Sequence, residues 1–444
     1  MATAHSNAMF QNHTSLPIAI IGGGMGGLAL AIGLLKHGVK VHVYEAAAAF
    51  AEIGAGVAFG VNATTALHLL DPRLLDGYKK HATFNADPAR ASTFYTMRWG
   101  TGMPESADHA AGDFICHLDD IWHSERAEML GVKTRSCIHR ARLLEELVAL
   151  LPEGITTFGK NFQGAEESAS GSFRLYFTDG TTVEAAAIIG CDGIKSKVRE
   201  LVCPSVQASY ARECAYRAVV PKVDALKALG PDLALNGQIY CGYGGYIVTY
   251  PIENGDFINM VAIPQDEADS CGWGSGDWTV PATTSEILQR FAGWYPPLLS
   301  LISRYHLPSK WAMFHLQHDR PYYNRHICLM GDSAHATVPH LAAGAGMAME
   351  DAYILSNLIA SSGSIEKLQE VFRAYDVVRR PRTQDCIKAS LQASCGYDFS
   401  LPGIGDDVTA LKEHLEQSFR WLWHVDLEAQ LATAKTILAR GVSP

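Results

Sequence analysis

The sequence predicts an α/β fold in which parallel-sheet segments near both ends of the chain enclose an inserted, largely antiparallel sheet. Near the start, the stretch IAIIGGGMGGLALAIGLLKHGVKVHVYEA, residues 18–46, changes from a strand pattern to a helix pattern and back. A buried strand pattern returns at 326–332, HICLMGD. Between about 205 and 320, aromatic strands such as GQIYCGYGGYIVTYPI indicate antiparallel pairing. This order predicts a nucleotide-binding domain that a second domain interrupts.

The first elements form a βαβ unit. Residues 16–21 are expected to be a buried strand, 25–37 a helix ended by Gly38, and 39–45 a second strand. Residues 140–151, RARLLEELVALL, have the apolar spacing of an amphipathic helix, and the following PEG ends it.

Later elements are predicted in the same way. A hairpin turns at Asp179-Gly180 and continues into a buried strand that ends at Gly190. DSCGWGSGDW, residues 269–278, is expected to be a loop. After residue 332 a long helical stretch is expected to break at Pro381. Residues 406–440 are helical by periodicity.

Composition excludes several classes of protein. The chain has 444 residues, of which 48% are hydrophobic and 18% charged, as expected for a globular protein with a large core. The net charge of −10 argues against a nucleic-acid or anionic-membrane surface. Its ten cysteines are scattered, which suggests a reducing, cytoplasmic compartment. We expect a loose polar tail over the first fifteen residues and no membrane-spanning segment.

The glycine-rich turn has the spacing of a dinucleotide-binding fingerprint. Gly22 permits the tight turn, Gly24 lets the backbone approach a pyrophosphate, and Gly27 lets helix and strand pack closely. Glu45 ends the second strand, where an acid can bind a ribose hydroxyl. The fingerprint alone fits NAD and FAD equally. No second fingerprint occurs, so a nicotinamide cofactor has no Rossmann domain of its own.

Two further motifs complete a recognisable set. GCDGIKSKVR, residues 190–199, puts Asp192-Gly193 after a strand, and GDSAHATVPHLAAGAGMAMEDA, 331–352, does the same with Asp332. Together with the fingerprint, they resemble the three motifs of single-component FAD-dependent aromatic hydroxylases of the para-hydroxybenzoate hydroxylase type. Segments such as EIGAGVAFGVNA (52–63), CAYRAVV (214–220) and FRWLWHVDL (419–427) are most similar to salicylate hydroxylases and to fungal hydroxylases that dearomatise polyketide phenols.

The resemblance implies a fold and a reaction. The fold is a Rossmann-type FAD-binding domain (16–80, 130–203 and 320–400), an inserted, largely antiparallel substrate domain (81–129 and 204–319) and a C-terminal helical segment (401–444). The reaction is NAD(P)H- and O2-dependent hydroxylation of a small phenolic ring, through a C4a-hydroperoxide of the flavin, in secondary metabolism. The protein would be a monomer or homodimer without nucleic-acid or membrane partners.

The resemblance also assigns residues to FAD. Glu45 would bind the adenosine ribose, Arg140 would lie near the pyrophosphate and Asp332 would bind the ribityl hydroxyls. The backbone at the start of the last motif's helix would face the flavin pyrimidine, where amides stabilise negative charge. Asp192 would contact both FAD and NAD(P)H. Further expected FAD contacts are Ala55, Gly56, Gly344, Ala345 and Gly346.

Two positions depart from the family pattern. The usual Pro-x-x-Gly before the flavin is here Pro339 to Ala342, and alanine costs roughly 1 kcal/mol or more if that position needs a positive φ. Tyr246 stands where both groups of relatives tend to have histidine, so a histidine-based acid–base role does not transfer directly.

The substrate site is predicted from a charge in an apolar strand. Arg217 within CAYRAVV needs a partner or a function, and a cation can stabilise the phenolate that hydroxylation requires. The resemblance pairs it with Tyr250 as a phenolate clamp, which favours dearomatisation and makes these two the expected catalytic residues. Tyr246, Pro339 and His340 are further expected substrate contacts.

Alternative functions stay open at this point. Salicylate 1-hydroxylase activity, with decarboxylation to catechol, belongs to the same class, since salicylate hydroxylases keep the arginine. A flavin oxidase or reductase that never hydroxylates and an NAD-dependent dehydrogenase are other possibilities. Neither a metal-ligand spacing nor a serine-hydrolase elbow occurs, so no metal is expected.

Overall fold

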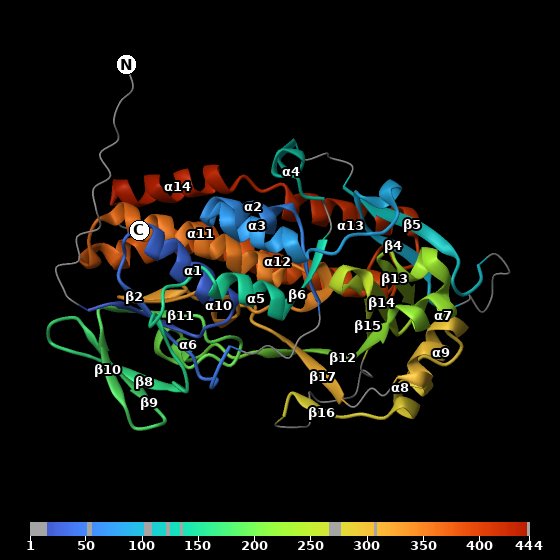
Figure 1. Cartoon of the computed structure of the whole chain (residues 1–444), viewed down its shortest axis with the longest axis horizontal. Helices are drawn as coiled ribbons and strands as arrows, with labels where there is room; N and C mark the ends of the chain where they lie inside the picture. The colour runs from blue at the N-terminus through green and yellow to red at the C-terminus, as the bar shows by residue number, and fades with distance from the viewer. Residues whose placement is uncertain are drawn as a thin grey trace, which may run out of the picture.

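The structure is a computed structural model that describes residues 16–50, 56–101, 109–120, 125–133, 136–265, 277–305 and 309–441. Two large sheets lie on one side of a group of long helices (Figure 1). The expected tail, Ala55 and most of the expected loop at 269–278 lie outside the described residues.

The first sheet is parallel except at one edge. It has six strands in the order β18-β19-β11-β1-β2-β7, and the β1, β2 and β11 strands pair in parallel. Its strands are β1 Ile18–Ile21, β2 Val41–Tyr44, β7 Thr156–Thr157, β11 Ala187–Gly190, β18 Tyr323–Asn324 and β19 Ile327–Leu329. Helix α1, Met25–Lys36, connects β1 to β2, so the predicted βαβ unit is confirmed.

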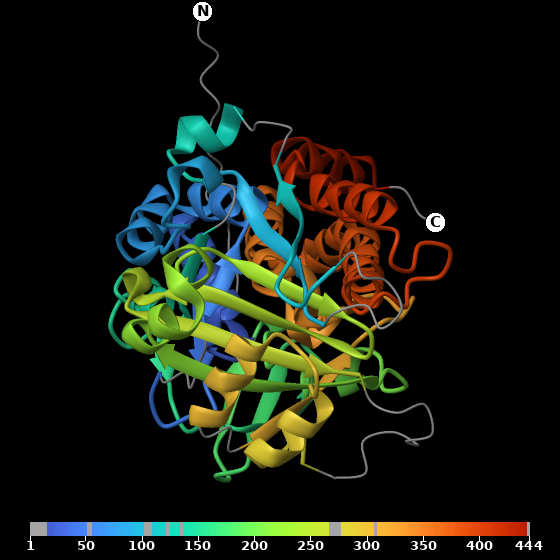
Figure 2. The same ribbon diagram turned by 90° about the vertical axis from the view of Figure 1, so that its right-hand side faces the viewer.

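The second sheet has eight strands in the order β16-β17-β12-β15-β14-β13-β4-β5 and crosses the front of Figure 2. All its pairs are antiparallel except β13 with β4. Its strands are β4 Thr93–Trp99, β5 Phe114–Asp119, β12 Ser209–Pro221, β13 Gln238–Gly242, β14 Gly245–Ile252, β15 Phe257–Pro264, β16 Thr279–Pro281 and β17 Ser309–His315. The predicted antiparallel insertion is therefore confirmed.

The two faces of this sheet have different partners. Ile258, Met260 and Ala262 of β15 belong to a separate core with helices on the outer face. The alternate residues Asn259, Val261 and Ile263 face the opposite side, because side chains alternate along a strand. That inner face lines a cavity described below.

Two small sheets complete the strands. β3 Gly56–Phe59 pairs with β6 Ser136–His139, and β8 Phe162–Glu167, β9 Phe173–Phe177 and β10 Thr182–Ala185 form a separate three-stranded sheet. The hairpin predicted at Asp179-Gly180 is confirmed as the β9–β10 connection.

Thirteen more α-helices follow α1 within the described residues. They are α2 Val61–Leu70, α3 Pro72–His81, α4 Glu125–Leu130, α5 Arg140–Val148, α6 Val198–Val202, α7 Lys222–Ala234, α8 Thr284–Arg290, α9 Pro296–Arg304, α10 Asp332–His335, α11 Gly344–Ser362, α12 Leu368–Tyr397, α13 Val408–Trp423 and α14 Leu427–Arg440. The C-terminal helical segment is confirmed, and it lies along α11 and α12 (Figure 1).

The predicted break at Pro381 is wrong, because α12 runs through it. Proline removes the N–H that would bond the carbonyl of Val377. Val377 is 47% exposed, so water can satisfy that carbonyl. Buried ion pairs of Arg379 and Arg382 with Glu350 hold the helix on both sides of the proline. The real break falls between α11 and α12, where Gly363 has a φ of 69°.

Among the described residues, no helix has both the length and the apolar character needed to cross a membrane.

The strands of the six-stranded sheet come from residues 18–44, 156–190 and 323–329, and those of the eight-stranded sheet from 93–119 and 209–315. The exact domain boundaries stay a prediction.

Candidate active site

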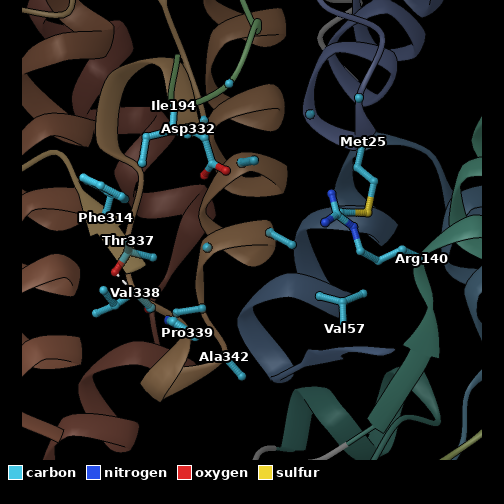
Figure 3. Close-up of a pocket in the computed structure, with 18 of the residues that line it drawn as sticks. Met25, Val57, Arg140, Ile194, Phe314, Asp332, Thr337, Val338, Pro339 and Ala342 are labelled. Carbon is cyan, nitrogen blue, oxygen red and sulfur yellow. Dashed lines mark hydrogen bonds between the residues drawn. The ribbon is translucent and has the colours of Figure 1, made fainter. Parts of the chain in front are cut away.

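A cavity of about 490 Å³ runs between the two large sheets. Its walls come from the turn before α1, the start of α5, the β11–α6 turn, and the segment from Met330 to Ala348. Figure 3 shows Met25, Arg140 and Val57 on one wall, and Asp332 and Pro339 on the facing wall. The predicted cofactor residues that line it are Gly24, Gly27, Gly56, Arg140, Asp332, Gly344 and Ala345.

The glycine turn leaves space where a pyrophosphate would approach. Gly22 has a φ of 106°, and a Cβ there would lie 2.3 Å from the Cys191 carbonyl oxygen. A Cβ on Gly27 would lie 2.1 Å from the Gly22 carbonyl oxygen, so both positions require glycine. A Cβ on Gly24, by contrast, meets no protein atom within 4 Å. Gly24 therefore opens onto the cavity, and the start of α1 presents free backbone N–H groups there.

Glu45 does not line the cavity, but it shapes the glycine turn. Its Oε2 accepts a hydrogen bond from the Gly23 N–H at 2.6 Å and its Oε1 accepts one from the Ala47 N–H at 2.8 Å. A carboxylate has about four acceptor sites. Acceptor capacity for a ribose hydroxyl is therefore still available.

Asp332 presents its carboxylate to the cavity. Among the described residues, no side chain or backbone group donates a hydrogen bond to that carboxylate, and burial raises its pKa. The side chain is exposed to the cavity, and a ligand that filled the cavity would remove water from the carboxylate, which is costly unless the ligand donates hydrogen bonds. Hydroxyl donors of such a ligand would meet that need, so the residue fits the predicted ribityl contact.

Asp192 has a different place from the one predicted. Its carboxylate accepts hydrogen bonds from the Ser196 hydroxyl at 2.5 Å and from the N–H groups of Lys197 and Val198 at 2.7 and 3.1 Å. These bonds hold the turn before α6, and it is the neighbouring Gly193 that lines the cavity. The structure thus brings the Asp192 backbone turn, rather than its carboxylate, to the site.

The segment before α11 carries the strain that the sequence suggested. Ala342 has a φ of 52° and a ψ of 36°, which is the left-handed conformation that glycine usually supplies. It precedes α11, whose first residues Gly344 and Ala345 line the cavity without a side-chain cap. Gly346 lies just outside the lining and faces Asn62 and Ala63. The free amides of this helix start favour a negative group in the cavity.

A second, smaller cavity of about 140 Å³ adjoins the first and shares Gly56, Val57, Arg217, Pro339 and Ala342 with it. Most of its lining is apolar. The predicted substrate residues that line it are Arg217, Tyr246, Tyr250, Pro339 and His340. All five are therefore brought together.

Arg217 is the cation shared by both cavities. Its side chain is exposed, and part of that exposed surface faces the cavities. Its guanidinium carbon lies 5.7 Å from the centre of the Trp311 ring. Loss of hydration lowers the pKa of this guanidinium, Tyr250 opposes that shift and Arg140 adds to it. An arginine keeps its charge even so.

Tyr250 is engaged with the backbone of β3. Its hydroxyl donates a hydrogen bond to the Gly56 carbonyl oxygen at 3.1 Å. The single hydroxyl proton is thus used, and the oxygen is left as an acceptor toward its surroundings.

Asn259 is a site residue that only the structure identifies. It is 1% exposed, lines the small cavity from β15, and neither Nδ2 nor Oδ1 has a hydrogen-bond partner among the described residues. An unsatisfied buried amide costs about 1–3 kcal/mol per group. The signal available in the sequence was an asparagine within the otherwise apolar strand FINMVAI.

A cluster of three polar side chains extends from the wall of the small cavity into the protein interior. The Tyr246 hydroxyl hydrogen-bonds with His340 Nδ1, and His340 Nε2 lies 2.7 Å from Glu213 Oε2. Sequence analysis missed Glu213, although an acid just before the apolar stretch CAYRAVV is as unusual as Arg217 within it. The described residues contain no cluster of metal-binding side chains.

Comparison with known proteins gives concordant matches. The FAD binding domain family matches residues 15–390. A 6-methylsalicylate 1-monooxygenase from Aspergillus terreus is 34% identical, over 97% of this chain and 93% of that protein. A salicylate hydroxylase from Pseudomonas putida is also 34% identical, over 97% of both. A solved salicylate hydroxylase substrate complex is similar with a TM-score of 0.82 and 31% identity, over 94% of this chain and 98% of that one.

Proposed function

The chain belongs to the FAD binding domain family and is an FAD-dependent aromatic monooxygenase, and from this premise we propose that it hydroxylates a single-ring phenol of the salicylate type. Electrons come from NAD(P)H and the oxygen atom from O2, as is typical of such monooxygenases. The two relatives at 34% identity are named for salicylate and 6-methylsalicylate, which supports this substrate class.

The size and charge of the small cavity carry the proposal. Its volume is about 140 Å³, and an apolar protein cavity of about 150 Å³ is known to accept benzene. One aromatic ring with small substituents therefore suits it. Arg217 is the permanent cation available to an anionic oxygen on that ring.

In this proposal the chain's own residues bind the two halves of FAD and stabilise negative charge at its ring end. Bound FAD supplies the redox chemistry and the activation of oxygen. Gly24, Glu45 and Arg140 would hold its adenine half and pyrophosphate, and Asp332 its ribityl hydroxyls. The amides of Gly344 and Ala345 would stabilise negative charge at the ring end of the cofactor.

Arg217 has the central role toward the substrate. A free phenol has a pKa of about 10, so at neutral pH it is almost entirely protonated and weakly nucleophilic. A guanidinium beside the phenolic oxygen favours the phenolate. The apolar walls of the cavity strengthen that attraction because they exclude water.

Dearomatising hydroxylation is the second candidate outcome. The pair of Arg217 and Tyr250 at one cavity favours it, as the resemblance suggested. Tyr250 donates its proton to Gly56, however, so it would act on the substrate only after its hydroxyl turns. Salicylate hydroxylases, which the resemblance associates with decarboxylation, keep the arginine but tend to have phenylalanine in place of the tyrosine.

Product analysis tests the proposal. The purified protein would be given NADH or NADPH and a panel of salicylates, resorcylic aldehydes and two-ring phenols, with product mass and CO2 release measured. Single-ring substrates should gain one oxygen atom; catechol with CO2 identifies decarboxylation, and a non-aromatic dienone identifies dearomatisation. NAD(P)H use without any oxygen insertion across the panel would make the protein a flavin reductase or oxidase and contradict the proposal.

Two further expectations belong to the same proposal. A cytoplasmic location fits the nine described cysteines, all of which are free thiols. We also expect the protein to act as a monomer or homodimer.

A further inference from the structure

Asn259 is a buried polar side chain in the wall of the small cavity. It is 1% exposed, and both polar atoms of its amide, Nδ2 and Oδ1, lack a hydrogen-bond partner among the described residues. Its neighbours on this face of β15, Val261 and Ile263, are apolar and line the same cavity. A buried amide without partners costs free energy, and most such groups in proteins have a structural or functional explanation.

The pairing of the strands places Asn259 beside two other polar residues of the cavity. Asn259 lies directly opposite Tyr250 of β14 and opposite Val219 of β12. Arg217, two residues before Val219, is therefore its diagonal neighbour on the same face of the sheet. Diagonal neighbours in antiparallel strands lie about 7–8 Å apart. One aromatic ring in the cavity can therefore present one oxygen to Arg217 and a second substituent to Asn259.

The surroundings of the amide leave its hydrogen bonds to a ligand. Tyr250, directly across the strand pair, donates its hydroxyl proton to the Gly56 carbonyl oxygen. The wall around these residues is formed mainly by apolar side chains, which are Val57, Ile239, Val248, Val261 and Ile263. A substrate in this cavity is thus the group that meets the amide.

A primary amide needs a ligand that both accepts and donates hydrogen bonds. Nδ2 carries two N–H donors and Oδ1 is an acceptor. Salicylate bound as a phenolate has only acceptor oxygens, so it can satisfy Nδ2 but leaves Oδ1 without a donor. A second, neutral hydroxyl group on the ring would donate to Oδ1. This requirement holds whichever way the amide is turned, because both of its polar atoms lack a partner.

We propose that Asn259 binds a second hydroxyl group of the substrate, so that the protein prefers phenols with two ring hydroxyls to salicylate itself. Arg217 holds the ionised oxygen of the ring. The neutral hydroxyl donates its hydrogen bond to Oδ1 of Asn259. Asn259 thus determines which ring binds, and no bond of the amide is made or broken in the reaction.

This inference rests on the proposed function and narrows its substrate class. The proposed function requires one phenolic ring in the small cavity and an anionic oxygen at Arg217. The inference adds a hydrogen-bond donor at a second position of that ring. A site that hydrogen-bonds a substrate hydroxyl discriminates strongly against the analogue that lacks it, because the buried polar group is then left unpaired.

Binding to the oxidised, FAD-loaded protein tests the inference. Salicylate and its dihydroxybenzoate isomers would be titrated at pH 7, with dissociation constants obtained from the change in flavin absorbance. At least one isomer should bind at least about fivefold more tightly than salicylate, because it satisfies a buried acceptor that salicylate leaves unpaired. The isomer that binds most tightly identifies the position of the second hydroxyl.

A fluorinated ligand separates the donor from the size of the substituent. Fluorosalicylate with fluorine at the preferred position has a similar shape but no proton to donate. In wild type it should bind within about twofold of salicylate, because Oδ1 again has no donor. This comparison uses wild-type protein alone, so it does not depend on the folding of any variant. Fluorosalicylate that binds as tightly as the preferred dihydroxybenzoate would contradict the inference.

Variants of two neighbouring wall residues assign the preference to the amide. Asn259→Leu should bind salicylate and the preferred dihydroxybenzoate within about twofold of each other, because the acceptor is gone. Asn259→Asp keeps an acceptor and should retain the preference, while its charge weakens the binding of salicylate. Val261→Ala, the matched control, should weaken both ligands alike and keep the wild-type ratio. FAD content and circular dichroism are measured for each variant.

The outcomes distinguish this inference from the proposed function. Equal binding of salicylate and every dihydroxybenzoate by wild type would overturn the inference, and so would a preference that persists in Asn259→Leu. If salicylate gains an oxygen atom but wild type shows no such preference, the proposed function stands and only this inference fails. If no phenol of the panel changes the flavin absorbance or is hydroxylated, the proposed function itself fails.

Discussion

The carboxylate of Asp351 accepts a hydrogen bond from the backbone N–H of Gly331 at 2.9 Å. Gly331 has a φ of 59°, and the residue after it, Asp332, faces the large cavity. Asp351 is in turn held by Arg379 Nε at 2.7 Å and by His335 Nε2 at 2.5 Å, and all three side chains are buried. The turn that aims Asp332 is therefore fixed from behind by protein groups, independently of any ligand.

Asp332→Ala should weaken FAD retention while the fold stays intact, because the turn does not depend on the Asp332 carboxylate. Hydrogen bonds to a charged group contribute about 1.5–3 kcal/mol, so the dissociation constant should rise roughly tenfold or more. Flavin fluorescence titration measures it. Asp332→Asn keeps one acceptor oxygen and should be affected less; an unchanged dissociation constant in Asp332→Ala would remove this residue from the site.

Gly24→Val should lose FAD without losing the fold. Its Cβ meets no protein atom within 4 Å, so the side chain projects into the space reserved for the pyrophosphate. The matched control is Gly27→Val, whose Cβ would overlap the Gly22 carbonyl oxygen and should impair folding itself. Absorbance at flavin wavelengths and circular dichroism separate the two effects. Normal flavin content in Gly24→Val would contradict the assignment of FAD to this turn.

Ala342→Gly should stabilise the FAD-free protein. Alanine in the left-handed conformation costs about 1–2 kcal/mol, and the extra freedom of glycine in the unfolded chain returns about 0.4–1 kcal/mol of that. The free energy of unfolding should therefore rise by about 0.5–1 kcal/mol in denaturant titration. Ala343→Gly, at a φ of −105°, should instead lower it by about 0.5–1 kcal/mol. Equal losses in both variants would mean that Ala342 is not strained.

Asn259→Leu should stabilise the substrate-free protein and weaken substrate binding. Both polar atoms of the amide are buried without a partner, so an apolar side chain of similar size removes a cost of about 1–3 kcal/mol. A substrate hydroxyl or carboxyl that used the amide would then lose its partner, and KM should rise. Thermal unfolding and steady-state kinetics with the best phenol test both effects together. Destabilisation with an unchanged KM would show that water, rather than substrate, satisfies the amide.

The parts of the fold that the sequence predicted are those with local signals. The βαβ unit, the turn at Asp179-Gly180 and the C-terminal helices each follow from a pattern within a few tens of residues. The strain at Ala342 could also be predicted, because alanine stood where the family pattern has glycine. Pro381 misled the prediction, since local propensity says nothing of the buried arginines that hold α12 together.

The parts of the site that could not be predicted depend on contacts between distant segments. The partner of Tyr250 is a backbone carbonyl in β3, and that of His340 is Glu213 in another sheet strand. Asp192 had the expected motif, yet its carboxylate caps its own turn. A motif places a residue near a site, whereas the direction of its side chain is decided by neighbours that the sequence does not bring together.

The most direct test of the central claim is the yield of hydroxylated product per NAD(P)H in Arg217→Ala. If the guanidinium stabilises the phenolate, this variant should keep bound FAD but lose product at pH 7, with NAD(P)H consumption ending in hydrogen peroxide. Raising the pH from about 7 to 9 should partly restore the yield, because hydroxide then supplies the anion.

Tyr250→Phe is the matched comparison. One neutral hydrogen bond contributes about 0.5–1.5 kcal/mol, so its loss of yield should be smaller than that of the arginine variant. The account predicts low product yield in Arg217→Ala at pH 7, a partial recovery at pH 9 and a near-normal yield in Tyr250→Phe. Wild-type yield per NAD(P)H in Arg217→Ala at pH 7 would contradict it and would mean that the phenolate is held elsewhere.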